Sequence, residues 1–483
     1  MSMKHLILLL SILSAPVFGE IIPTPQSVKY GPVVKVRADR VKVTAPQIPA
    51  AKLALEFLGL TGNPDQKEFE IILKNGGGDS QNYRINYDSP GKSITIDGAG
   101  PAGMFNGVMT LLQLIRRDGE ELEITLAEVT DGPVWKQRFM GNYSPFNTAN
   151  LEFAARYKFG GVAYQYREEW SKFTEKRFRK FFIPQRKYVE AGVLEFMLVY
   201  HIYATRGERE RKLFNIASEN DLKELADRCR FARESGFTHI MICADDWTPL
   251  ENGRYSLIHP EEKAKFKDST GHGHGFLMAY LQKTVPGVQW VFCPPVYSLN
   301  HTADAPLMQQ YLKELGEALP NDIAIAWTGP KVISSRITAA EEKTFSGYAG
   351  GHKTFIWDNS ECVPFPIHRW ETDITPELAR DGIFVNAKSF DGDHWKTWFV
   401  TGANDYLWNP AQYDKERSYA SIYHRFRPGD DVREVRAFQE LFDKLNKMTA
   451  KDDFRKDLAE LKEREQKLRA KGLISRWNTY YLN

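Results

Sequence analysis

Eight short apolar segments, most of them followed by a helical segment, constrain the fold of this chain more than any other feature. They are rich in β-branched and aromatic residues and are bounded by turn-forming residues, as buried strands are. The predicted strands are Arg138–Tyr143, Gly161–Tyr166, Leu194–His201, Thr238–Asp245, Gln289–Tyr297, Ile323–Gly329, Thr354–Asn359 and Gly382–Ser389. Strands that alternate with helices pair in parallel through crossover connections.

Helical periodicity fills the intervals between these strands. The predicted helices include Asn150–Tyr157, Phe173–Ala191, Ser218–Ser235, Gly275–Thr284 and Pro306–Leu319. Eight strand–helix units match a (β/α)8 barrel, which typically takes about 250 residues. The alternative is a doubly wound open sheet, but no Gly-x-Gly-x-x-Gly turn follows the first strand. We therefore expect an α/β protein with a TIM barrel.

The segments on either side of the barrel differ from it in pattern. Residues 20–133 read as a small α+β domain, with strands at Phe69–Leu73, Tyr83–Tyr87 and Ser93–Asp97 and a helix at Met104–Ile115. The barrel is assigned to residues 134–425. Residues 426–483 are charged and helical, and their apolar stripe predicts packing against the barrel.

The first 19 residues have the organisation of a secretory signal peptide. Lys4 supplies positive charge, an apolar run follows from Leu6 to Leu13, and Val17-Phe18-Gly19 is a small-residue cleavage site before Glu20. An uncleaved anchor is the alternative, but the run is shorter than the ~20 residues of a spanning helix. We expect export to the periplasm or the extracellular space, with no other attachment to a membrane.

Charge and cysteine content restrict the partners. Lys and Arg number 64 and Asp and Glu 62, so a net charge of +2 favours neither nucleic acid nor an anionic surface as a partner. The four cysteines (Cys229, Cys243, Cys293 and Cys362) fit no zinc ribbon, and we expect free buried thiols. His272-Gly-His274 lacks a third ligand. No metal, other cofactor or protein partner is predicted.

The predicted strand ends carry polar and aromatic side chains, and active sites of this barrel class lie at the carboxyl ends of the strands. The fourth strand runs into Asp245-Asp246. Neighbouring carboxylates push their pKa values apart, which can provide an acid and a base at one site. A helix cap beside a solvated neighbour is the alternative for such a pair. His201, at the end of the third strand, is a candidate either for substrate contact or for packing.

These residue types suit a carbohydrate. The apolar faces of sugar rings stack on aromatic rings, here Tyr143, Trp327 and Trp357, while amides and charged groups bind hydroxyls. Glycosidic hydrolysis needs an acid and usually a second carboxylate several ångströms away. Adjacent carboxylates suit instead a substrate-assisted route, in which the carbonyl oxygen of a 2-acetamido group attacks the anomeric carbon.

Several motifs in order along the chain resemble the β-N-acetylglucosaminidases of glycoside hydrolase family 84, which include O-GlcNAcases and bacterial hyaluronidase-like enzymes. They are Asp245-Asp246, Cys293-Pro-Pro-Val-Tyr297, Trp327-Thr-Gly-Pro-Lys331, Trp357-Asp-Asn359 and Asp405-Tyr-Leu-Trp-Asn-Pro410. The front segment, from Ile22-Pro-Thr-Pro25 to Thr110-Leu-Leu-Gln-Leu114, resembles the family-20-type accessory domain of hexosaminidases.

The resemblance implies a role for each matching residue. Asp245 corresponds to the aspartate that orients the acetamido group, and Asp246 to the general acid and base. The implied substrate-binding residues are Gly141, Tyr143, Arg167, Tyr297, Trp327, Thr328, Trp357, Asn359 and Asn386. Arg167 stands where the family usually has lysine. Pro364 stands where an aspartate usually grips distal hydroxyls, and Glu361 or Asp358 is the expected replacement.

The resemblance implies an exo-acting, retaining glycosidase that removes terminal β-linked N-acetylglucosamine through an oxazoline intermediate. The implied partner is a carbohydrate or glycoconjugate. One alternative is a glycan-binding or degenerate barrel without turnover. Another is an N-acetylhexosaminidase of altered sugar specificity.

Overall fold

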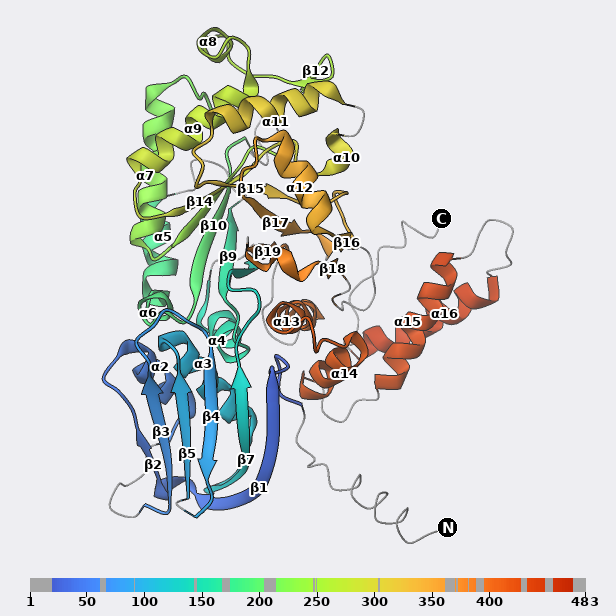
Figure 1. Cartoon of the computed structure of the whole chain (residues 1–483). Coiled ribbons are helices and arrows are strands. Elements are labelled where there is room, and N and C mark those ends of the chain that lie inside the picture. Colours follow the sequence, from blue (N-terminus) through green and yellow to red (C-terminus); the bar gives the residue numbers. More distant parts are fainter. Residues whose placement is uncertain are drawn as a thin grey trace.

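The structure is a computed structural model. It describes residues 20–60, 67–90, 92–142, 146–166, 174–203, 214–245, 248, 250–302, 305–360, 370, 372–380, 382–387, 395–426, 432–447 and 455–471. A sheet domain, a barrel and a set of helices follow one another along the chain (Figure 1). The expected fold class, a TIM barrel preceded by a small α+β domain, is confirmed.

Eight parallel strands close the barrel in the order β10-β11-β14-β15-β17-β19-β8-β9. The strands are β8 (Arg138–Asn142), β9 (Gly161–Tyr166), β10 (Glu195–His201), β11 (His239–Cys243), β14 (Gln289–Cys293), β15 (Ala324–Trp327), β17 (Thr354–Asp358) and β19 (Ile383–Val385). Each begins within one residue of its predicted start. Several end earlier than predicted, because their last residues leave the strand ladder and enter the loops at the barrel mouth.

Helices connect and cover these strands. They are α4 (Thr148–Arg156), α5 (Glu175–Phe182), α6 (Lys187–Glu190), α7 (Glu219–Glu234), α8 (Pro260–Lys265), α9 (Thr270–Thr284), α10 (Leu299–Thr302), α11 (Pro306–Ala318), α12 (Ala339–Tyr348), α13 (Trp395–Trp408) and α14 (Lys415–Phe426). The single helix expected at Phe173–Ala191 is divided. A 3-10 turn, η4 (Ile183–Gln185), separates α5 from α6, because Pro184 has no backbone N–H to continue the helix. Another 3-10 turn, η6 (Pro376–Arg380), precedes β19.

Two short sheets sit in the loops of the barrel. The hairpin of β12 (Leu250–Glu251) and β13 (Arg254–Tyr255) follows β11, and β16 (Arg336–Ile337) pairs with β18 (Asp373–Ile374). The hydroxyl of Tyr255 donates a hydrogen bond of 3.2 Å to the carbonyl oxygen of Pro295. This contact ties the hairpin to the loop after β14.

The barrel strands alternate between two apolar cores, since successive side chains of a strand point to opposite faces. The interior core contains Phe139, Ala163, Met197, Val199, Met241, Cys243, Val291, Cys293, Ala326, Phe355, Trp357 and Phe384. The alternate residues, such as Ile240 and Ile242, belong to the core between strands and helices. This alternation determines which side chains at the strand ends turn into the barrel mouth.

The N-terminal domain is a seven-stranded sheet in the order β1-β7-β4-β5-β3-β2, with β6 paired to β7. Its elements are β1 (Ser27–Arg37), η1 (Ala38–Arg40), β2 (Val41–Thr44), α2 (Pro49–Leu58), β3 (Phe69–Asn75), β4 (Tyr83–Asp88), β5 (Ser93–Gly98), α3 (Pro101–Gln113), β6 (Ile115–Asp118) and β7 (Glu121–Asp131). Helices α2 and α3 pack against each other, and α3 contacts β3, β4 and β5. Sequence analysis located β3, β4, β5 and α3.

Polar contacts join this domain to the barrel. Asp405, in α13, accepts a hydrogen bond of 2.6 Å from the backbone N–H of Thr24. Asn409 donates to the carbonyl oxygen of Pro25 at 3.0 Å, and the indole N–H of Trp408 donates to Asp131 at 2.7 Å. The motif Asp405-Tyr-Leu-Trp-Asn-Pro410 therefore holds the two domains together.

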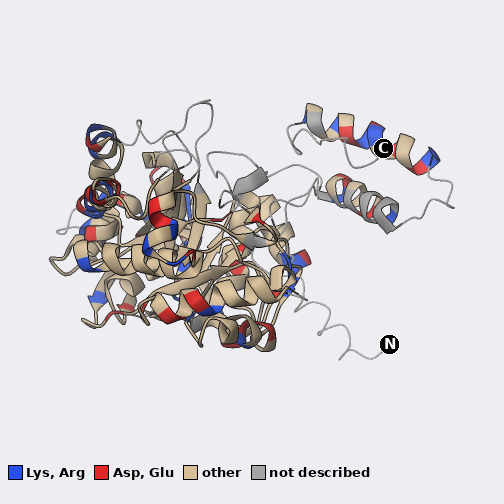
Figure 2. Cartoon of the chain, turned by 90° about the horizontal axis from the view of Figure 1, so that it is seen from above, with Lys and Arg blue, Asp and Glu red and all other residues tan. Residues whose placement is uncertain are grey.

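The C-terminal helices α15 (Val432–Lys447) and α16 (Arg455–Ala470) pack against each other through Val435, Phe438 and Leu461, which are fully buried. Helix α15 also contacts α14. In both views the pair stands beside the barrel (Figures 1 and 2). The pair therefore contacts the barrel through α14, one of its covering helices.

Lys and Arg are interspersed with Asp and Glu along the same helices (Figure 2). Within the described ranges, no helix combines the length and the apolar character needed to cross a bilayer.

Candidate active site

Inward-facing residues from six strands meet at the carboxyl end of the barrel. Each continues the inward alternation of its strand beyond the interior core. They are Gly141, Gln165, His201, Asp245, Asn359 and Asn386. Five of the six are buried, and Asn359 is half-buried. All but Gln165 were singled out from the sequence.

Asp245 is held by His201, which ends the neighbouring strand. Atom Nδ1 of His201 lies 3.0 Å from Oδ1 of Asp245. The exposed fraction is 2 % for the His201 side chain and 10 % for Asp245. The carbonyl oxygen of Asp245 accepts a hydrogen bond of 3.0 Å from the backbone N–H of Thr248, which turns the chain after β11. The hydrogen bond from His201 thus holds the carboxylate of Asp245, and the hydrogen bond from Thr248 holds its backbone.

Four predicted site residues lie outside the described residues. They are Asp246, Tyr143, Arg167 and Glu361. Asp246 directly follows Asp245, Tyr143 follows the last residue of β8, and Arg167 follows the last residue of β9. Their assignments remain predictions from the sequence.

A chain of amides lines one side of the barrel mouth. Oδ1 of Asn359 accepts hydrogen bonds from the indole N–H of Trp357 at 2.7 Å and from Nδ2 of Asn386 at 2.8 Å. Nδ2 of Asn359 donates to the carbonyl oxygen of Val332 at 3.1 Å. Oδ1 of Asn386 in turn accepts from Nε2 of Gln165 at 2.7 Å. Asn359 and Asn386, both predicted substrate ligands, therefore belong to one connected network.

The orientation of each amide group in this network, that is, which atom is oxygen and which is nitrogen, follows from the orientation of Asn359. An indole N–H only donates and a backbone carbonyl only accepts, so the orientation of Asn359 is unambiguous. That orientation makes Asn386 a donor to Asn359, and Gln165 a donor to Asn386. Within the described residues, Oε1 of Gln165 is then a buried acceptor without a partner. Sequence analysis missed Gln165, although its alternation with the inward Ala163 could have identified it.

Gly141 lies next to the last residue of β8, as expected, whereas Tyr297 lies in the loop four residues beyond the end of β14 and not at the strand end that sequence analysis expected. A Cβ atom on Gly141 would lie 3.0 Å from ring atoms of Phe384 and from the carbonyl oxygen of Val385, so a glycine fits there best. Tyr297 is half-buried and packs against the interior core. Its ring centroid lies 4.8 Å from that of His301.

The structure corrects the expectation that Trp327 forms a wall of the sugar site. Trp327 is fully buried in the core between strands and helices, and its ring stacks on Phe345 of α12 with centroids 5.3 Å apart. Its neighbour Thr328 is also buried, and its hydroxyl donates to the carbonyl oxygen of Lys331 at 2.7 Å. Trp357, in contrast, lies inside the barrel, and its ring forms T-shaped contacts with Phe384 and His201.

Asp358 was one of two expected replacements for the missing distal aspartate. It follows the outward alternation of β17, and its carboxylate accepts hydrogen bonds from Ser360 and Thr372. Burial raises the pKa of Asp358 to about 6. It therefore lies apart from the inward strand-end residues.

One group of described residues could hold a metal ion. His201, Cys243 and Asp245 offer ligand atoms within 4.8 Å of one another, a nitrogen, sulfur and oxygen set that Zn²⁺ accepts. The direct hydrogen bond between His201 and Asp245 already occupies two of the three. His272 and His274 point to different partners, since His272 contacts Glu317 and His274 contacts Tyr311. Cys229, Cys243 and Cys293 are buried and form no disulfide within the described part of the chain, whereas Cys362 lies outside it.

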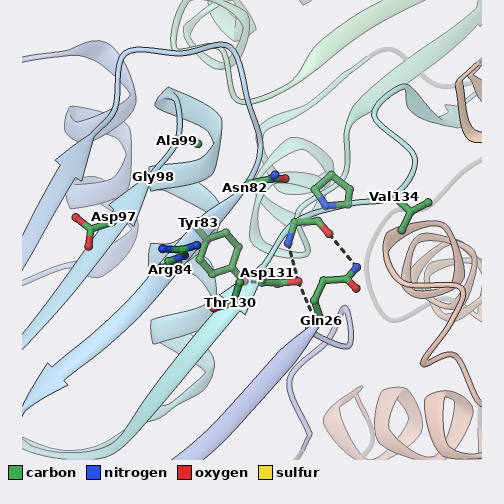
Figure 3. A pocket seen from close by; sticks show the side chains of 12 residues that line it. Gln26, Asn82, Tyr83, Arg84, Asp97, Gly98, Ala99, Thr130, Asp131 and Val134 are labelled. Atoms are coloured by element: carbon green, nitrogen blue, oxygen red, sulfur yellow. Dashed lines mark hydrogen bonds between the residues drawn. The ribbon is translucent and has the colours of Figure 1, made fainter.

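A pocket of about 600 Å³ lies in the N-terminal domain, over β4, β5 and β7 (Figure 3). Arg84, Asp97 and Asp131 are among the residues that line it. Asp131 accepts hydrogen bonds from Gln26, Gly132, Tyr83, Lys158 and Trp408, so its carboxylate has no free capacity for chemistry. The barrel mouth is therefore the candidate active site.

The fold is a (β/α)8 barrel, and in enzymes of this fold the active site lies at the carboxyl ends of the strands. Residues 199–440 match the family described as beta-N-acetylglucosaminidase, which spans half of the chain. The chain belongs to this family, and the resemblance to glycoside hydrolase family 84 is confirmed. Residues 19–132 match domain 2 of glycosyl hydrolase family 20.

Curated relatives match a shorter region. Protein O-GlcNAcase of Rattus norvegicus is 26 % identical over 147 residues, which is 28 % of this chain and 16 % of the relative. The protein O-GlcNAcase of Mus musculus matches to the same extent. The matched region thus spans about a sixth of the length of these relatives.

Solved structures share the fold over most of the chain. CpGH84B has a TM-score of 0.63 and 17 % identity, and the match covers 93 % of this chain and 87 % of that chain. A GH20 exo-β-N-acetylglucosaminidase from Vibrio harveyi, solved with N-acetylglucosamine, has a TM-score of 0.59 and 14 % identity, with 85 % and 78 % of the two chains covered.

Proposed function

We propose that this protein is an exo-acting, retaining glycosidase that removes terminal β-linked N-acetylglucosamine. The observation that carries the proposal is the carboxylate of Asp245, held at the inward end of β11 with Asp246 next in the chain, within the region that matches the family. The amide network and Trp357 beside it supply the polar and apolar groups that a sugar requires.

The proposed reaction is substrate-assisted. Asp245 accepts the N–H of the 2-acetamido group, and the acetamido carbonyl oxygen attacks the anomeric carbon. Asp246 donates its proton to the departing glycosidic oxygen, and a bicyclic oxazoline forms as that bond breaks. Asp246 then takes a proton from water, which opens the oxazoline at the anomeric carbon. Two inversions give net retention.

The other predicted substrate-binding residues form two groups, those inside the region that matches the family and those before it. Tyr297, Asn359, Asn386 and the predicted Glu361 lie within residues 199–440, so the family match supports their proposed roles in binding the acetamido group and the sugar hydroxyls. Gly141, Tyr143 and Arg167 precede the matched region. Their proposed roles rest on the resemblance of their motifs and on their positions at the ends of β8 and β9.

The test is release of chromophore from an aryl N-acetyl-β-D-glucosaminide. We expect turnover by the wild type, and a loss of about 10²- to 10⁴-fold in Asp246→Asn, because a general acid contributes that much. Asp245→Asn should fall at least as far, since its substitution leaves the acetamido group unanchored. Asp322→Asn, an exposed carboxylate outside the barrel mouth, is the matched control.

Two outcomes would contradict the proposal. A folded wild type that binds a thiazoline mimic of the oxazoline without turnover would favour the glycan-binding alternative. Turnover of an N-acetylgalactosaminide alone would favour the altered sugar specificity.

We also propose that the protein is exported and that residues 1–19 are removed. Expression of the full chain in an export-competent host should yield a mature protein that begins at Glu20, as N-terminal sequencing can establish. A cell-retained product that still begins at Met1 would contradict this.

A further inference from the structure

His201 has a place in the barrel that the proposed mechanism does not yet use. It ends β10, which pairs in parallel with β11, and His201 stands in register with Cys243. From there its ring reaches Asp245, two residues beyond the end of β11. The side chain is almost completely buried and contacts the carboxylate directly at 3.0 Å.

The chemistry of the two groups determines the direction of this contact. An ionised carboxylate only accepts hydrogen bonds, so Nδ1 of His201 carries the hydrogen and donates it to Oδ1 of Asp245. Within the described residues, this is the side-chain contact that Asp245 makes, and Oδ2 receives none. The two carboxylate oxygens of Asp245 therefore differ, since Oδ1 already accepts a hydrogen bond from His201 and Oδ2 does not.

We propose that His201 is a positioning residue for the acetamido group of the substrate. It holds Oδ1 and fixes the rotation of the carboxylate, so that Oδ2 remains free to accept the acetamido N–H. This inference rests on the proposed function, since it assigns Asp245 the substrate contact stated there. It adds a residue outside the family motifs that sequence analysis recognised.

The remaining nitrogen of His201 supports a role in the site. Nε2 is buried, and within the described residues it has no hydrogen-bond partner. A buried polar atom without a partner costs free energy, on the order of 1–3 kcal/mol. A leucine or phenylalanine would fill the same space beside Trp357 without that cost. The gain that offsets it is the hydrogen bond to Asp245.

Two substitutions separate this role from packing. In His201→Asn, Nδ2 stands two bonds beyond Cβ, as Nδ1 does in histidine, so the donor to Asp245 is kept. In His201→Phe the ring is kept and the donor is lost. His352→Phe is the control, because His352 is also largely buried but bonds the backbone of Gly316, away from the barrel mouth.

The first readout is kcat/KM on the aryl N-acetyl-β-D-glucosaminide. We expect His201→Phe to lose about 10- to 100-fold, the usual effect of removing a group that orients a functional side chain. His201→Asn should recover most of that loss.

The second readout compares two competitive inhibitors. One is a thiazoline that mimics the oxazoline, and the other is a glucose-derived iminosugar without an acetamido group. His201→Phe should weaken the thiazoline by a factor similar to the loss in kcat/KM and leave the iminosugar within about twofold, because Asp245 contacts the acetamido group alone.

The outcomes are distinguishable. A wild type that neither turns over substrate nor binds the thiazoline overturns the proposed function and this inference with it. An active wild type with His201→Phe equally active overturns this inference alone. Equal weakening of both inhibitors, without recovery in His201→Asn, assigns His201 to packing and also overturns it.

Discussion

Nζ of Lys158 lies 3.3 Å from Oδ2 of Asp131, and neither side chain is exposed to solvent. Lys158 follows α4 of the barrel, and Asp131 ends β7 of the N-terminal domain. The ammonium group also donates to the hydroxyls of Tyr83 and Thr110, at 3.0 and 2.9 Å. Burial lowers the pKa of Lys158, which the charge of Asp131 partly opposes. A completely desolvated ion pair therefore joins the two domains.

Lys158→Met should destabilise the protein by about 3 to 5 kcal/mol, because it leaves the carboxylate of Asp131 buried without its cation. The double variant with Asp131→Asn should cost less than the sum of the single variants. Urea unfolding measures all three. Lys187→Met is the control, since its pair with Glu56 also links the domains but is exposed, and should cost at most about 1 kcal/mol. Equal effects at the two sites would contradict the prediction.

Asp358 should make stability fall as the pH rises through about 6. Burial raises its pKa to about 6 in the folded protein, against about 3.9 in an unfolded chain. The folded state therefore binds the proton more tightly, and the stability so gained is complete below pH ~4 and lost as the pH rises through ~6. Asp358→Asn should be more stable than the wild type near pH 8 by a few kcal/mol, on the order of 3, and lose this advantage near pH 4.

Thermal unfolding of Asp358→Asn and the wild type across this range measures the difference. The exposed variant Asp322→Asn should show no such trend. A constant difference between Asp358→Asn and the wild type at every pH would refute the assignment.

Gly141→Ala should destabilise the barrel mouth, by about 1–3 kcal/mol, because the added methyl group overpacks against Phe384 and the backbone of Val385. Phe384→Leu in the same chain should recover part of the loss, since the ring contact disappears while the backbone contact stays. Gly347→Ala in α12 is the control, because no atom lies within 4 Å of its added Cβ, and it should be neutral or stabilising. Full recovery in the double variant would mean that the backbone contact contributes nothing.

Gln165→Glu should test the direction of the amide network. The substitution replaces the donor to Oδ1 of Asn386 with a buried carboxylate, which should cost roughly 3 to 5 kcal/mol near neutral pH. Gln165→Met, which leaves Oδ1 of Asn386 without a donor but adds no charge, should cost about 1 to 3 kcal/mol. The difference in stability between Gln165→Glu and Gln165→Met should become smaller at about pH 5, because a glutamate side chain begins to take up its proton there. Chemical unfolding at both pH values measures it, and Gln165→Glu no worse than Gln165→Met would reverse the assigned direction.

The fold was predictable because the local pattern of apolar residues shows where strands and helices alternate along the chain. All eight barrel strands begin within one residue of the predicted position. Strands β1 and β7 of the N-terminal domain were missed. Most residues of β1 are exposed or half-buried, so its hydrophobic alternation is weak. It is a strand because β7 pairs with it over nearly its whole length.

The candidate site was predictable in part. Asp245 was found because two carboxylates at the end of an apolar strand are unusual, and Asn359 and Asn386 because they follow neighbouring strands. Trp327 was misassigned. Adjacent residues of a strand point to opposite faces, and Trp327 follows the outward alternation of Ile325. The alternation of side chains along β15 therefore points Trp327 away from the barrel interior.

The sequence by itself determined the order of strands and helices, and hence the barrel, and it placed a carboxylate pair after the fourth strand. Only the tertiary structure decided the partners of these groups. His201 and Asp245 are 44 residues apart, and Gln165 and Asn386 are 221 residues apart. Such contacts depend on strand register and on closure of the barrel, because a hydrogen bond requires atoms within about 3 Å of each other. The local sequence pattern indicates which face of a strand a residue occupies, whereas closure of the barrel determines which residue of another strand it contacts.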